Sequence, residues 1–442
     1  MFTNFLQLGC EAALRDYDIF PKVVPAGKTG AITIRPLGAH AAFAAGPQKL
    51  CVCPLDDGNP LYYPDRANWR EFEVLPDADG CIRFSFDFSG EQMYFIRIGE
   101  KKLQLRVYAV GEDLVGRYPF RGDLHMHSCR SDGRQAPAIV CAEYRKLGYD
   151  FMAVTDHRRY EPSLEAIEAY KNVPIELTLV PGEEVHPPCD FAGKRINDVH
   201  IINFGGSRSV NIPAGREEAH WAEIEAYMRT IELPAHLPAS ERFAYASCLW
   251  VYNEIKKCGG LSLFCHPYWI ANVYHVPPAF VDAMMERGAF GAFEVLGGES
   301  YYEQNGFQAA QYYQDTARGR RYPVVGVTDT HNAYIHDNRN ALVASTLVFS
   351  PANEKDALIR SIEDFYSVAV DTIDETPRFV GEPRLVRYAH FLWENFFPLH
   401  DELCFEEGRA MKDYACGEPD AEELLRLISG RMRRQREKYF GW

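Results

Sequence analysis

Apolar and polar positions alternate along residues 1–117. Segments such as AGKTGAITIRPLG, KLCVCPLD and QMYFIRIGEKKLQLRVYAVG place apolar side chains at every second position, and Gly, Pro and Asp turns separate them. A period of two is typical of strands that bury one face. This region is therefore predicted to form an all-β, sandwich-like N-terminal domain. Within it, FEVLPDADGCIRFSF predicts a hairpin whose turn is DADG.

The pattern changes at residue 118, where short apolar segments begin to alternate with amphipathic ones such as PAIVCAEYRKLG and FQAAQYYQDTARG. Repeated strand–helix–strand order predicts a parallel β/α arrangement, which we place at residues 118–385. Residues 205–250 interrupt this rhythm and are interpreted as an insertion on the catalytic face. A helical C-terminal segment is predicted over 386–442. The predicted strands are GDLHMH, YDFMAVTDH, ELTLVPGEE, DVHIINF, GLSLFCH, GAFEVLGG and PVVGVTD.

Most of these predicted strands carry His, Asp or Glu at or near their ends. The two imidazoles of LHMH, two positions apart, would face the same side of a strand, where a shared metal ion satisfies both. The ends of parallel strands meet at one face of a β/α barrel, so the polar side chains are expected to converge there. Six of the 14 histidines lie at such positions. The residues concerned are His125, His127, Asp132, Asp156, His157, Glu183, Glu184, His200, His266, Asp329 and His331.

Six motifs, RGDLHMHSCRSDG, AVTDH, PGEEV, DVHIINF, FCHP and GVTDTH, occur in this order over roughly residues 118–350. With this order and spacing, the chain resembles the PHP (polymerase and histidinol phosphatase) family of metal-dependent phosphoesterases. The resemblance implies a distorted seven-stranded (β/α) barrel, which agrees with the number of predicted strands. It also implies two or three bound divalent metal ions. Mixed imidazole and carboxylate donors favour zinc, manganese or iron.

The resemblance further implies which residues hold the metals. A first site would be formed by His125, His127, Glu184 and Asp329, a second by Glu184, His200 and His266, and a third by Asp132, His157 and His331. Glu184 is preferred to Glu183 because the family places a glutamate two residues after a glycine, here Gly182. Asp156 is predicted to serve catalysis by orienting His157, since a ligating imidazole needs an outer hydrogen-bond partner.

The predicted function is hydrolysis of a small phosphorylated metabolite through a metal-activated hydroxide, which requires no protein nucleophile. Phosphate oxygens also need cationic partners. Arg158, directly after His157, is predicted to bind substrate and take part in catalysis, and Arg134 is a second predicted substrate-binding residue. Further candidate cations are Lys194, Arg195, Arg208 and Arg339. The residues interpreted as non-ligands are Cys129, Cys265, His186, His220, His275 and His336.

Three other functions are left open by the sequence. The protein could be a nucleotide phosphodiesterase or nuclease, or a hydrolase of C–N bonds. It could also be a metal-stabilised scaffold whose β-domain binds carbohydrate or protein. Tyr268 and Trp269 either wall the substrate pocket or pack under a loop. The substrate, the choice between monoester and diester, and the identity of the metals are not specified.

Charge and composition disfavour some classes of binding partner. The formal net charge is −15, which disfavours duplex nucleic acid as the main partner. No apolar run approaches the ~20 residues of a membrane span, and the N-terminus lacks the features of a signal peptide. We therefore expect a cytoplasmic protein without a membrane partner, whose 12 cysteines are reduced. The sequence leaves the oligomeric state open.

Overall fold

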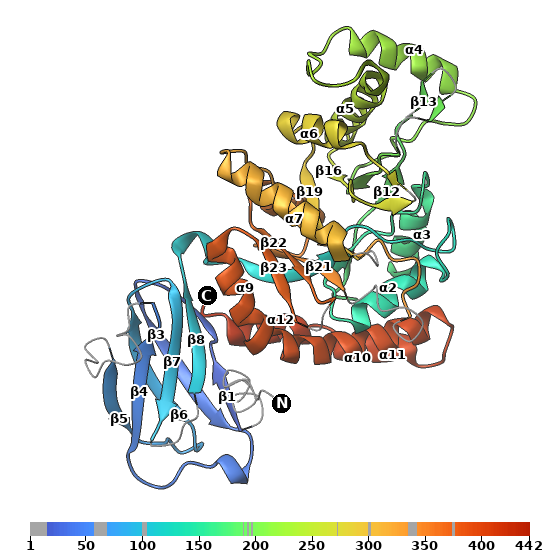
Figure 1. Cartoon of the computed structure of the whole chain (residues 1–442). Helices are drawn as coiled ribbons and strands as arrows, with labels where there is room; N and C mark the ends of the chain where they lie inside the picture. Colours follow the sequence, from blue (N-terminus) through green and yellow to red (C-terminus); the bar gives the residue numbers. More distant parts are fainter. Residues whose placement is uncertain are drawn as a thin grey trace. The chain divides into compact units, whose positions relative to one another are not determined.

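The computed structural model describes residues 16–56, 69–99, 104–188, 190–191, 194–195, 198–271, 273–298, 302–334, 343–373 and 376–442. The chain forms two compact units (Figure 1). Unit 1 comprises Met1–Arg117, Arg387–Leu403 and Gly430–Trp442, and unit 2 comprises Tyr118–Val386 and Cys404–Ser429. The C-terminal helices therefore contribute to both units.

Unit 1 contains two β-sheets that share one apolar core. The three-stranded sheet has the order β1-β3-β6, and the five-stranded sheet has the order β2-β8-β7-β4-β5. Alternate residues point inward, so Ile34 and Phe88 of the first sheet meet Leu50, Ile96 and Leu105 of the second in one buried cluster. The strands are β1 (Tyr17–Phe20), β2 (Val23–Pro25), β3 (Lys28–Pro36), β4 (Gln48–Pro54), β5 (Arg70–Val74), β6 (Ile82–Phe88), β7 (Gln92–Ile98) and β8 (Gln104–Val110).

The hairpin predicted across DADG does not form. β5 pairs with β4 and β6 pairs with β3, so the two expected partners lie in different sheets. The Asp77 carboxylate accepts hydrogen bonds from the backbone N–H of Asp79 at 2.9 Å and of Cys81 at 3.0 Å. This turn carries the chain from one sheet to the other. The alternation predicted both strands, but their partners depend on residues far away in the sequence.

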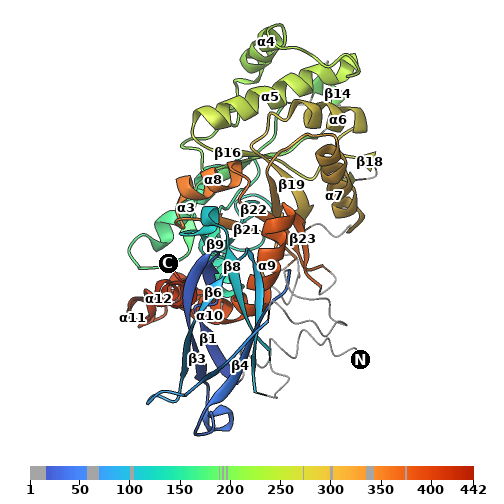
Figure 2. The same ribbon diagram turned by 90° about the vertical axis from the view of Figure 1, so that its left-hand side faces the viewer.

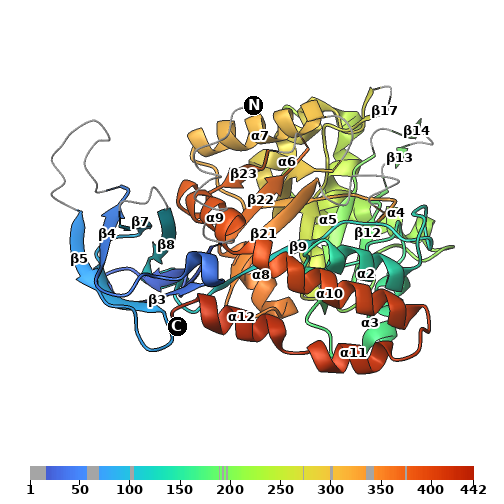
Figure 3. The ribbon, with the colours of Figure 1, turned by 90° about the horizontal axis from the view of Figure 1, so that it is seen from below.

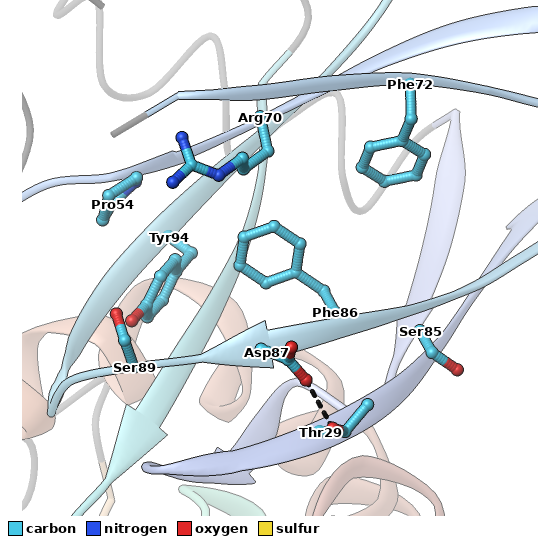
Figure 4. A pocket seen from close by; sticks show the side chains of 9 residues that line it. All are labelled: Thr29, Pro54, Arg70, Phe72, Ser85, Phe86, Asp87, Ser89 and Tyr94. Carbon is cyan, nitrogen blue, oxygen red and sulfur yellow. Dashed lines mark hydrogen bonds between the residues drawn. The ribbon is translucent and has the colours of Figure 1, made fainter. Parts of the chain in front are cut away.

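A cavity of about 970 Å³ opens in unit 1 (Figure 4). Strands of both sheets supply its walls. Phe72, Phe86 and Tyr94 contribute aromatic rings, and Arg70 and Asp87 contribute charged groups. The cavity therefore combines apolar surface with polar groups of both signs.

The end of the chain completes unit 1. The backbone N–H of Lys22 donates a hydrogen bond to the carbonyl of Tyr439 at 2.7 Å, at the end of α12. The Tyr439 hydroxyl in turn donates to the Asp18 carboxylate at 3.0 Å. These contacts tie the last residues of the chain to its first described strands.

Unit 2 is mixed α/β, with two larger sheets. The six-stranded sheet has the order β11-β10-β9-β21-β22-β23, and the five-stranded sheet has the order β12-β15-β16-β19-β20. Two short ladders, β13-β14 and β17-β18, are additional. The strands are β9 (Tyr118–Asp123), β10 (Phe151–Met152), β11 (Thr178–Leu179), β12 (Gly182–Val185), β13 (Asp190–Phe191), β14 (Lys194–Arg195), β15 (Ile201–Phe204), β16 (Leu261–Phe264), β17 (Ile270–Ala271), β18 (Val273–Tyr274), β19 (Ala292–Gly297), β20 (Val324–Val327), β21 (Ala344–Ser350), β22 (Ser367–Asp371) and β23 (Arg378–Gly381).

Helices cover the sheets of unit 2. α4 and α5 lie side by side (Figure 2). α2 and α3 share an apolar cluster with α11 and the later part of α10, which run beside them (Figure 3). Buried Arg145 of α2 pairs with Glu407 of α10. The described helices of the chain are α2 (Pro137–Lys146), α3 (Glu161–Tyr170), α4 (Glu217–Met228), α5 (Arg242–Lys257), α6 (Pro278–Arg287), α7 (Tyr302–Ala317), α8 (Lys355–Glu363), α9 (Pro383–Asn395), α10 (Phe397–Ala415), α11 (Ala421–Ile428) and α12 (Arg431–Tyr439). None of them is long and apolar enough to cross a bilayer.

The parallel arrangement predicted for unit 2 is wrong at β15. This strand is antiparallel to both of its neighbours, β12 and β16, whereas β16, β19 and β20 run parallel. The described residues between β12 and β15 form no helix, so no crossover imposes a parallel direction. The start of β15 consequently lies at the same edge as the ends of β12 and β16. His200, directly before β15, therefore reaches this edge from the opposite direction.

The continuous hydrogen-bonded strand pairs of unit 2 form two separate larger sheets and not one closed barrel. Two isolated parallel bridges join them, one between Met126 and Thr330 and one between His157 and Glu184. In the described part of the chain, no continuous ladder closes the strands into the seven-stranded barrel that the resemblance implied. The two bridges lie among the predicted metal ligands.

Candidate metal centre

The loops at one edge of the sheets bring all nine predicted ligands into one cluster. Leu124 and Met126, which alternate with the two histidines of LHMH, are buried in apolar clusters, so both imidazoles face the cluster as their spacing predicted. The nine ligands arise from the end of β9 (His125 and His127), the turn after it (Asp132), the ends of β10 (His157), β16 (His266) and β20 (Asp329 and His331), β12 itself (Glu184) and the start of β15 (His200).

Backbone hydrogen bonds align the HxH loop with the DxH loop. The N–H of Asp329 donates to the carbonyl of His125 at 2.9 Å, and the N–H of His127 donates to the carbonyl of Thr330 at 2.9 Å. This pairing continues beyond the ends of β9 and β20. It holds two ligand-bearing loops, about 200 residues apart in sequence, in fixed register.

Four side chains form the first group of donor atoms. His125 Nε2 lies 3.1 Å from Asp329 Oδ1 and 3.6 Å from Glu184 Oε2. His127 Nε2 lies 2.9 Å from the same Asp329 oxygen and 3.4 Å from the same Glu184 oxygen. A tetrahedron with bonds of roughly 2.0–2.1 Å has edges of about 3.3 Å. The four distances scatter around that value, so the four atoms are placed as ligands of one small cation would be.

Glu184 also belongs to a second group of donors. Its Oε1 lies 2.6 Å from His200 Nδ1 and 3.9 Å from His266 Nε2. His266 Nε2 is also 3.8 Å from Asp329 Oδ2. Glu184 and Asp329 thus each turn one oxygen to the first group and the other to the second. Such carboxylates can bridge two metals.

The third predicted group lies nearest to solvent. His157 Nε2 is 3.4 Å from Asp132 Oδ2, and His331 Nε2 is 3.3 Å from Asp132 Oδ1. The side chains of His157, His331 and Asp132 are 24%, 37% and 56% exposed, whereas those of His125 and Glu184 are fully buried. The cluster therefore opens to water on the side of the third group.

The buried donor atoms fit divalent cations. Polar atoms buried without a partner cost about 1–3 kcal/mol each, and they are retained where a ligand satisfies them. Imidazole nitrogens and carboxylate oxygens together suit Zn²⁺, Mn²⁺ or Fe²⁺. Within the described residues, the buried atoms of this region that have no hydrogen-bond partner are His125 Nδ1 and Nε2, His127 Nδ1, both oxygens of Glu184 and of Glu294, His200 Nε2 and His266 Nε2.

Burial and mutual charge set the protonation of the cluster. Burial disfavours the charged form of His200, but the adjacent Glu184 carboxylate outweighs it and raises the pKa to about 10. For His266, burial prevails and lowers the pKa to about 3, so this imidazole is neutral, as a ligand must be. Burial alone would raise the pKa of Glu184, but His200 and His125 hold it well below its usual range. Glu184 is therefore ionised at neutral pH.

The backbone is strained where it presents the ligands. Arg158, His266 and Asp329 have φ values of 56°, 25° and 49°, in the left-handed region that side chains with a Cβ disfavour. Such strain persists only where the surroundings enforce it, and it gathers at functional sites. Three loops that carry site residues share this feature.

Asp156 is placed differently from the prediction. Its carboxylate accepts hydrogen bonds from the backbone N–H of Ser128 at 3.0 Å and of Ser131 at 2.9 Å, and from both hydroxyls. The two nitrogens of His157 face Glu184 and Asp132 instead, so no ring nitrogen is left for Asp156. Asp156 orients the turn that leads to Asp132.

The two adjacent glutamates of β12 point to opposite sides, as strand geometry requires. Glu184 faces the imidazoles. Glu183 accepts hydrogen bonds from the N–H of Val210 at 2.7 Å and from the Asn211 amide at 2.6 Å. It therefore anchors the start of the segment predicted as an insertion.

Two of the predicted cations, Arg158 and Arg134, are tied to the cluster through their backbones. The backbone N–H of Arg158 donates to the carbonyl of Glu184 at 2.8 Å, and that of Arg134 donates to the carbonyl of His331 at 2.9 Å. Both arginines are exposed. Arg208 pairs with Glu254 at 2.6 Å. Arg339 and the side chains of Lys194 and Arg195 lie outside the described residues, as does His336.

Three residues near the centre were not predicted to belong to the site. Glu294 of β19 is buried beside His125, and its only sequence signal is an acidic residue inside a predicted apolar strand. Asp123 accepts a hydrogen bond from the N–H of His125 at 3.1 Å, and burial raises its pKa to about 6. His186, interpreted as a non-ligand, lies with Nε2 2.9 Å from Nδ1 of His157.

A hydroxyl network supports the two aligned loops. The Thr328 hydroxyl donates to Asp123 Oδ2 at 2.5 Å and lies 2.5 Å from the Tyr144 hydroxyl. Thr328→Val removes the hydroxyl and leaves buried polar atoms without a partner, so we expect a loss of about 1–3 kcal/mol in unfolding free energy. Urea unfolding followed by circular dichroism measures it. Thr230→Val, which removes a hydroxyl from an exposed helix end, should change the value by less than about 0.5 kcal/mol. Equal effects would contradict the proposed support.

The sequence is similar to a known protein over one short stretch. No family model matches the chain. A stretch of 63 residues is 36% identical to the DNA polymerase/3'-5' exonuclease PolX of Bacillus subtilis, which is 14% of this chain and 11% of PolX. The match therefore spans only about a tenth of that relative.

Two solved structures are similar to much of the chain. One is a two-domain protein with a predicted PHP-like metal-dependent phosphoesterase from Bacteroides vulgatus, at 16% identity, a TM-score of 0.42, and coverage of 63% of this chain and 71% of that one. The other is assigned as a metal-dependent phosphoesterase from Bifidobacterium adolescentis, at 21% identity, a TM-score of 0.34, and coverage of 48% and 87%. Both are described as metal-dependent phosphoesterases, at identities below 25% and TM-scores below 0.5.

Proposed function

We propose that this protein is a metal-dependent phosphoesterase that hydrolyses a small phosphorylated metabolite. The observation that carries the proposal is the first group of donors, in which His125 Nε2 and His127 Nε2 each lie between 2.9 and 3.6 Å from the same oxygens of Asp329 and Glu184. Structural zinc sites are commonly closed by thiolates, whereas mixed imidazole and carboxylate sites are typical of catalysis. The opening of the cluster to water supports a catalytic role.

Two or three divalent ions, zinc, manganese or iron, are proposed to occupy the three groups of donors. When bound, such ions supply Lewis acidity that activates water and neutralises charge on phosphate oxygens. The chain's own contribution is to hold the donors in register through the paired HxH and DxH loops. The exposed third group, with Asp132 and His331, faces the direction from which a substrate arrives.

Arg158 is proposed to bind a phosphate oxygen, and its removal tests this. The side chain is exposed beside His157, and its loop is tied to Glu184. A charge-assisted hydrogen bond contributes about 1.5–3 kcal/mol, so Arg158→Ala should lower kcat/KM about 10–100-fold. Steady-state kinetics measure this, and Arg360→Ala, on the exposed side of α8, is the control. Equal kinetics for the two variants would remove Arg158 from the site.

The general proposal is tested with an aryl phosphate monoester and the matching bis-aryl diester. Each is assayed with protein loaded with Mn²⁺ or Zn²⁺ and with protein treated with a chelator. We expect metal-dependent turnover, and faster monoester turnover would favour a metabolite phosphatase. Faster diester turnover would favour a nucleotide phosphodiesterase. Without turnover of either substrate, the phosphoesterase proposal fails, and C–N bond substrates would be tested next.

Hydrolysis of nucleotides is a second candidate function, because aromatic rings lie beside the second group. The ring of Trp269 is 5.7 Å from that of His266. The ring of Tyr268 is 5.8 Å from that of Phe307, and 45% of Phe307 is exposed. Exposed rings near a phosphate site suit a planar base. Comparing kcat/KM for a nucleoside 5′-monophosphate and for ribose 5-phosphate tests this, since the second carries a hydroxyl in place of the base.

The scaffold hypothesis places the working site in unit 1. The cavity with Phe72, Phe86 and Arg70 offers aromatic and charged groups to a carbohydrate or a protein. Under this hypothesis, disruption of the metal cluster leaves ligand binding to unit 1 unchanged. If disruption of the metal cluster instead abolishes turnover, the result favours the hypothesis that the protein is an enzyme.

We also propose that unit 2 contains a distorted barrel of seven strands. The two isolated bridges, from Met126 to Thr330 and from His157 to Glu184, support a distorted seven-stranded barrel formed by β9, β10, β12, β15, β16, β19 and β20. We further propose domains at 1–117 and 118–385, and a helical C-terminal segment at 386–442 that is divided between the two compact units. The ten described cysteines are free thiols, which supports a reducing compartment such as the cytoplasm.

A further inference from the structure

The five-stranded sheet of unit 2 buries a carboxylate that none of the predicted metal groups uses. Glu294 lies in the middle of β19, fully buried. Both of its oxygens are without a hydrogen-bond partner in the described residues. A buried carboxylate is costly unless a charged or donor group faces it. The imidazole of His125 lies beside it.

The two nitrogens of His125 face different surroundings. Nε2 points to Asp329 and Glu184 at 3.1 and 3.6 Å, the donors of the first group. Nδ1 lies 3.5 Å from Glu294 Oε2, on the other side of the ring. One nitrogen is therefore placed to bind a cation, and the other is placed to donate its hydrogen to a carboxylate.

We propose that Glu294 is the positioning residue of the first metal group: it accepts the Nδ1–H of His125 and thereby directs the Nε2 lone pair to the metal. The inference rests on the proposed function. A carboxylate in this place fixes the tautomer and rotation of the ring and makes the imidazole a stronger ligand. His331 shows the same principle with a different partner, since its Nδ1 lies 3.0 Å from the carbonyl of Asp329.

Gly297 leaves the room that this contact requires. A Cβ at Gly297 would lie 2.6 Å from Glu294 Oε1, closer than side chains tolerate. Gly297→Ala should therefore push the carboxylate away from His125 without changing a ligand. This gives a second variant that disturbs the same contact.

The test measures metal affinity directly, by titrating Mn²⁺ or Zn²⁺ into chelator-treated protein in a calorimeter. Removal of such an outer partner costs about 10–100-fold in affinity. Glu294→Gln can still accept the Nδ1–H, so we expect its dissociation constant to rise near the lower end of that range. Glu294→Leu and Gly297→Ala should lie toward the upper end. Val295→Ala, in the same strand but in the apolar core on its other side, should lower the melting temperature and leave affinity unchanged.

The melting temperature of the metal-free protein separates positioning from packing. Glu294→Leu leaves the Nδ1–H of His125 without its acceptor, so we expect a lower melting temperature, and Glu294→Gln, which keeps an acceptor, should lower it less. An unchanged metal affinity in both Glu294→Leu and Gly297→Ala, or an equal loss of affinity in Val295→Ala, would overturn the proposal. Unaltered protein that binds no metal would overturn the proposed function as well.

Cobalt substitution tests whether His125 and Glu294 instead bind a metal ion together with Cys265. The Cys265 thiol also lies near His125 and Glu294, and these three could bind a cation of their own. Thiolate ligation gives Co²⁺ an intense near-ultraviolet charge-transfer band. We expect this band to be absent, with visible absorption bands that weaken in Glu294→Leu. A thiolate band in the unaltered protein that disappears in Cys265→Ser would place a cation among Cys265, His125 and Glu294 and overturn the positioning role.

Discussion

Asp329→Ala is expected to lower metal-dependent hydrolysis of an aryl phosphate by a thousandfold or more, which corresponds to about 4 kcal/mol or more in activation free energy. Asp329 Oδ1 lies 3.1 Å from His125 Nε2 and 2.9 Å from His127 Nε2. Its other oxygen turns to His266 at 3.8 Å. No other carboxylate except Glu184 touches both groups in this way, among the residues that the structure describes. Removal of Asp329 should therefore weaken two metal sites at once.

The measurement is initial velocity at saturating Mn²⁺, with metal content determined on the same samples. Asp364→Ala is the matched control, because Asp364 is exposed at the end of α8. We expect this control to retain the full rate. A rate for Asp329→Ala within tenfold of the control would contradict the placement of Asp329 in the catalytic centre. Unchanged ligand binding to unit 1, with no turnover in either protein, would favour the scaffold.

Glu184→Gln is expected to reduce both turnover and metal stoichiometry. Glu184 Oε2 serves the first group, and Oε1 serves the second through His200 at 2.6 Å. Glutamine keeps the volume but removes the negative charge that His200 and His125 stabilise. It also replaces one acceptor oxygen by a donor NH₂, which cannot bind a cation. We expect the loss of at least one bound ion per chain and a rate at least a hundredfold lower.

Metal content after dialysis, measured by atomic emission, gives the stoichiometry, and the aryl phosphate assay gives the rate. Glu363→Gln, at the exposed end of α8, changes a glutamate of the same size outside the cluster and should alter neither. If Glu184→Gln kept the metal content of Glu363→Gln, Glu184 would not bridge the groups. Only the metal sites that do not use the Glu184 carboxylate would then remain proposed.

Much of the candidate site was predictable because its ligands follow local rules. A strand alternates its side chains, so LHMH placed both imidazoles on one face, opposite buried Leu124 and Met126. The adjacent glutamates Glu183 and Glu184 face opposite sides for the same reason. Such features depend on two or three neighbouring residues.

Other features depend on partners far away in the chain and were missed. The β5–β6 hairpin failed because each strand found a different sheet. Asp156 was expected at His157, but the serines of the preceding loop offer it four hydrogen bonds. The direction of β15 was also predicted wrongly.

The sequence by itself determined the donors of the candidate site: which of them are present, in which order, and beside which strands. These follow from residue identity and from the period of the backbone. Only the tertiary structure decided that β15 runs antiparallel, so that His200 arrives from the opposite direction. It alone also placed Glu294 behind His125. The physical reason is that strand pairing and burial are set by contacts between residues far apart in sequence, whose free energies no local pattern records.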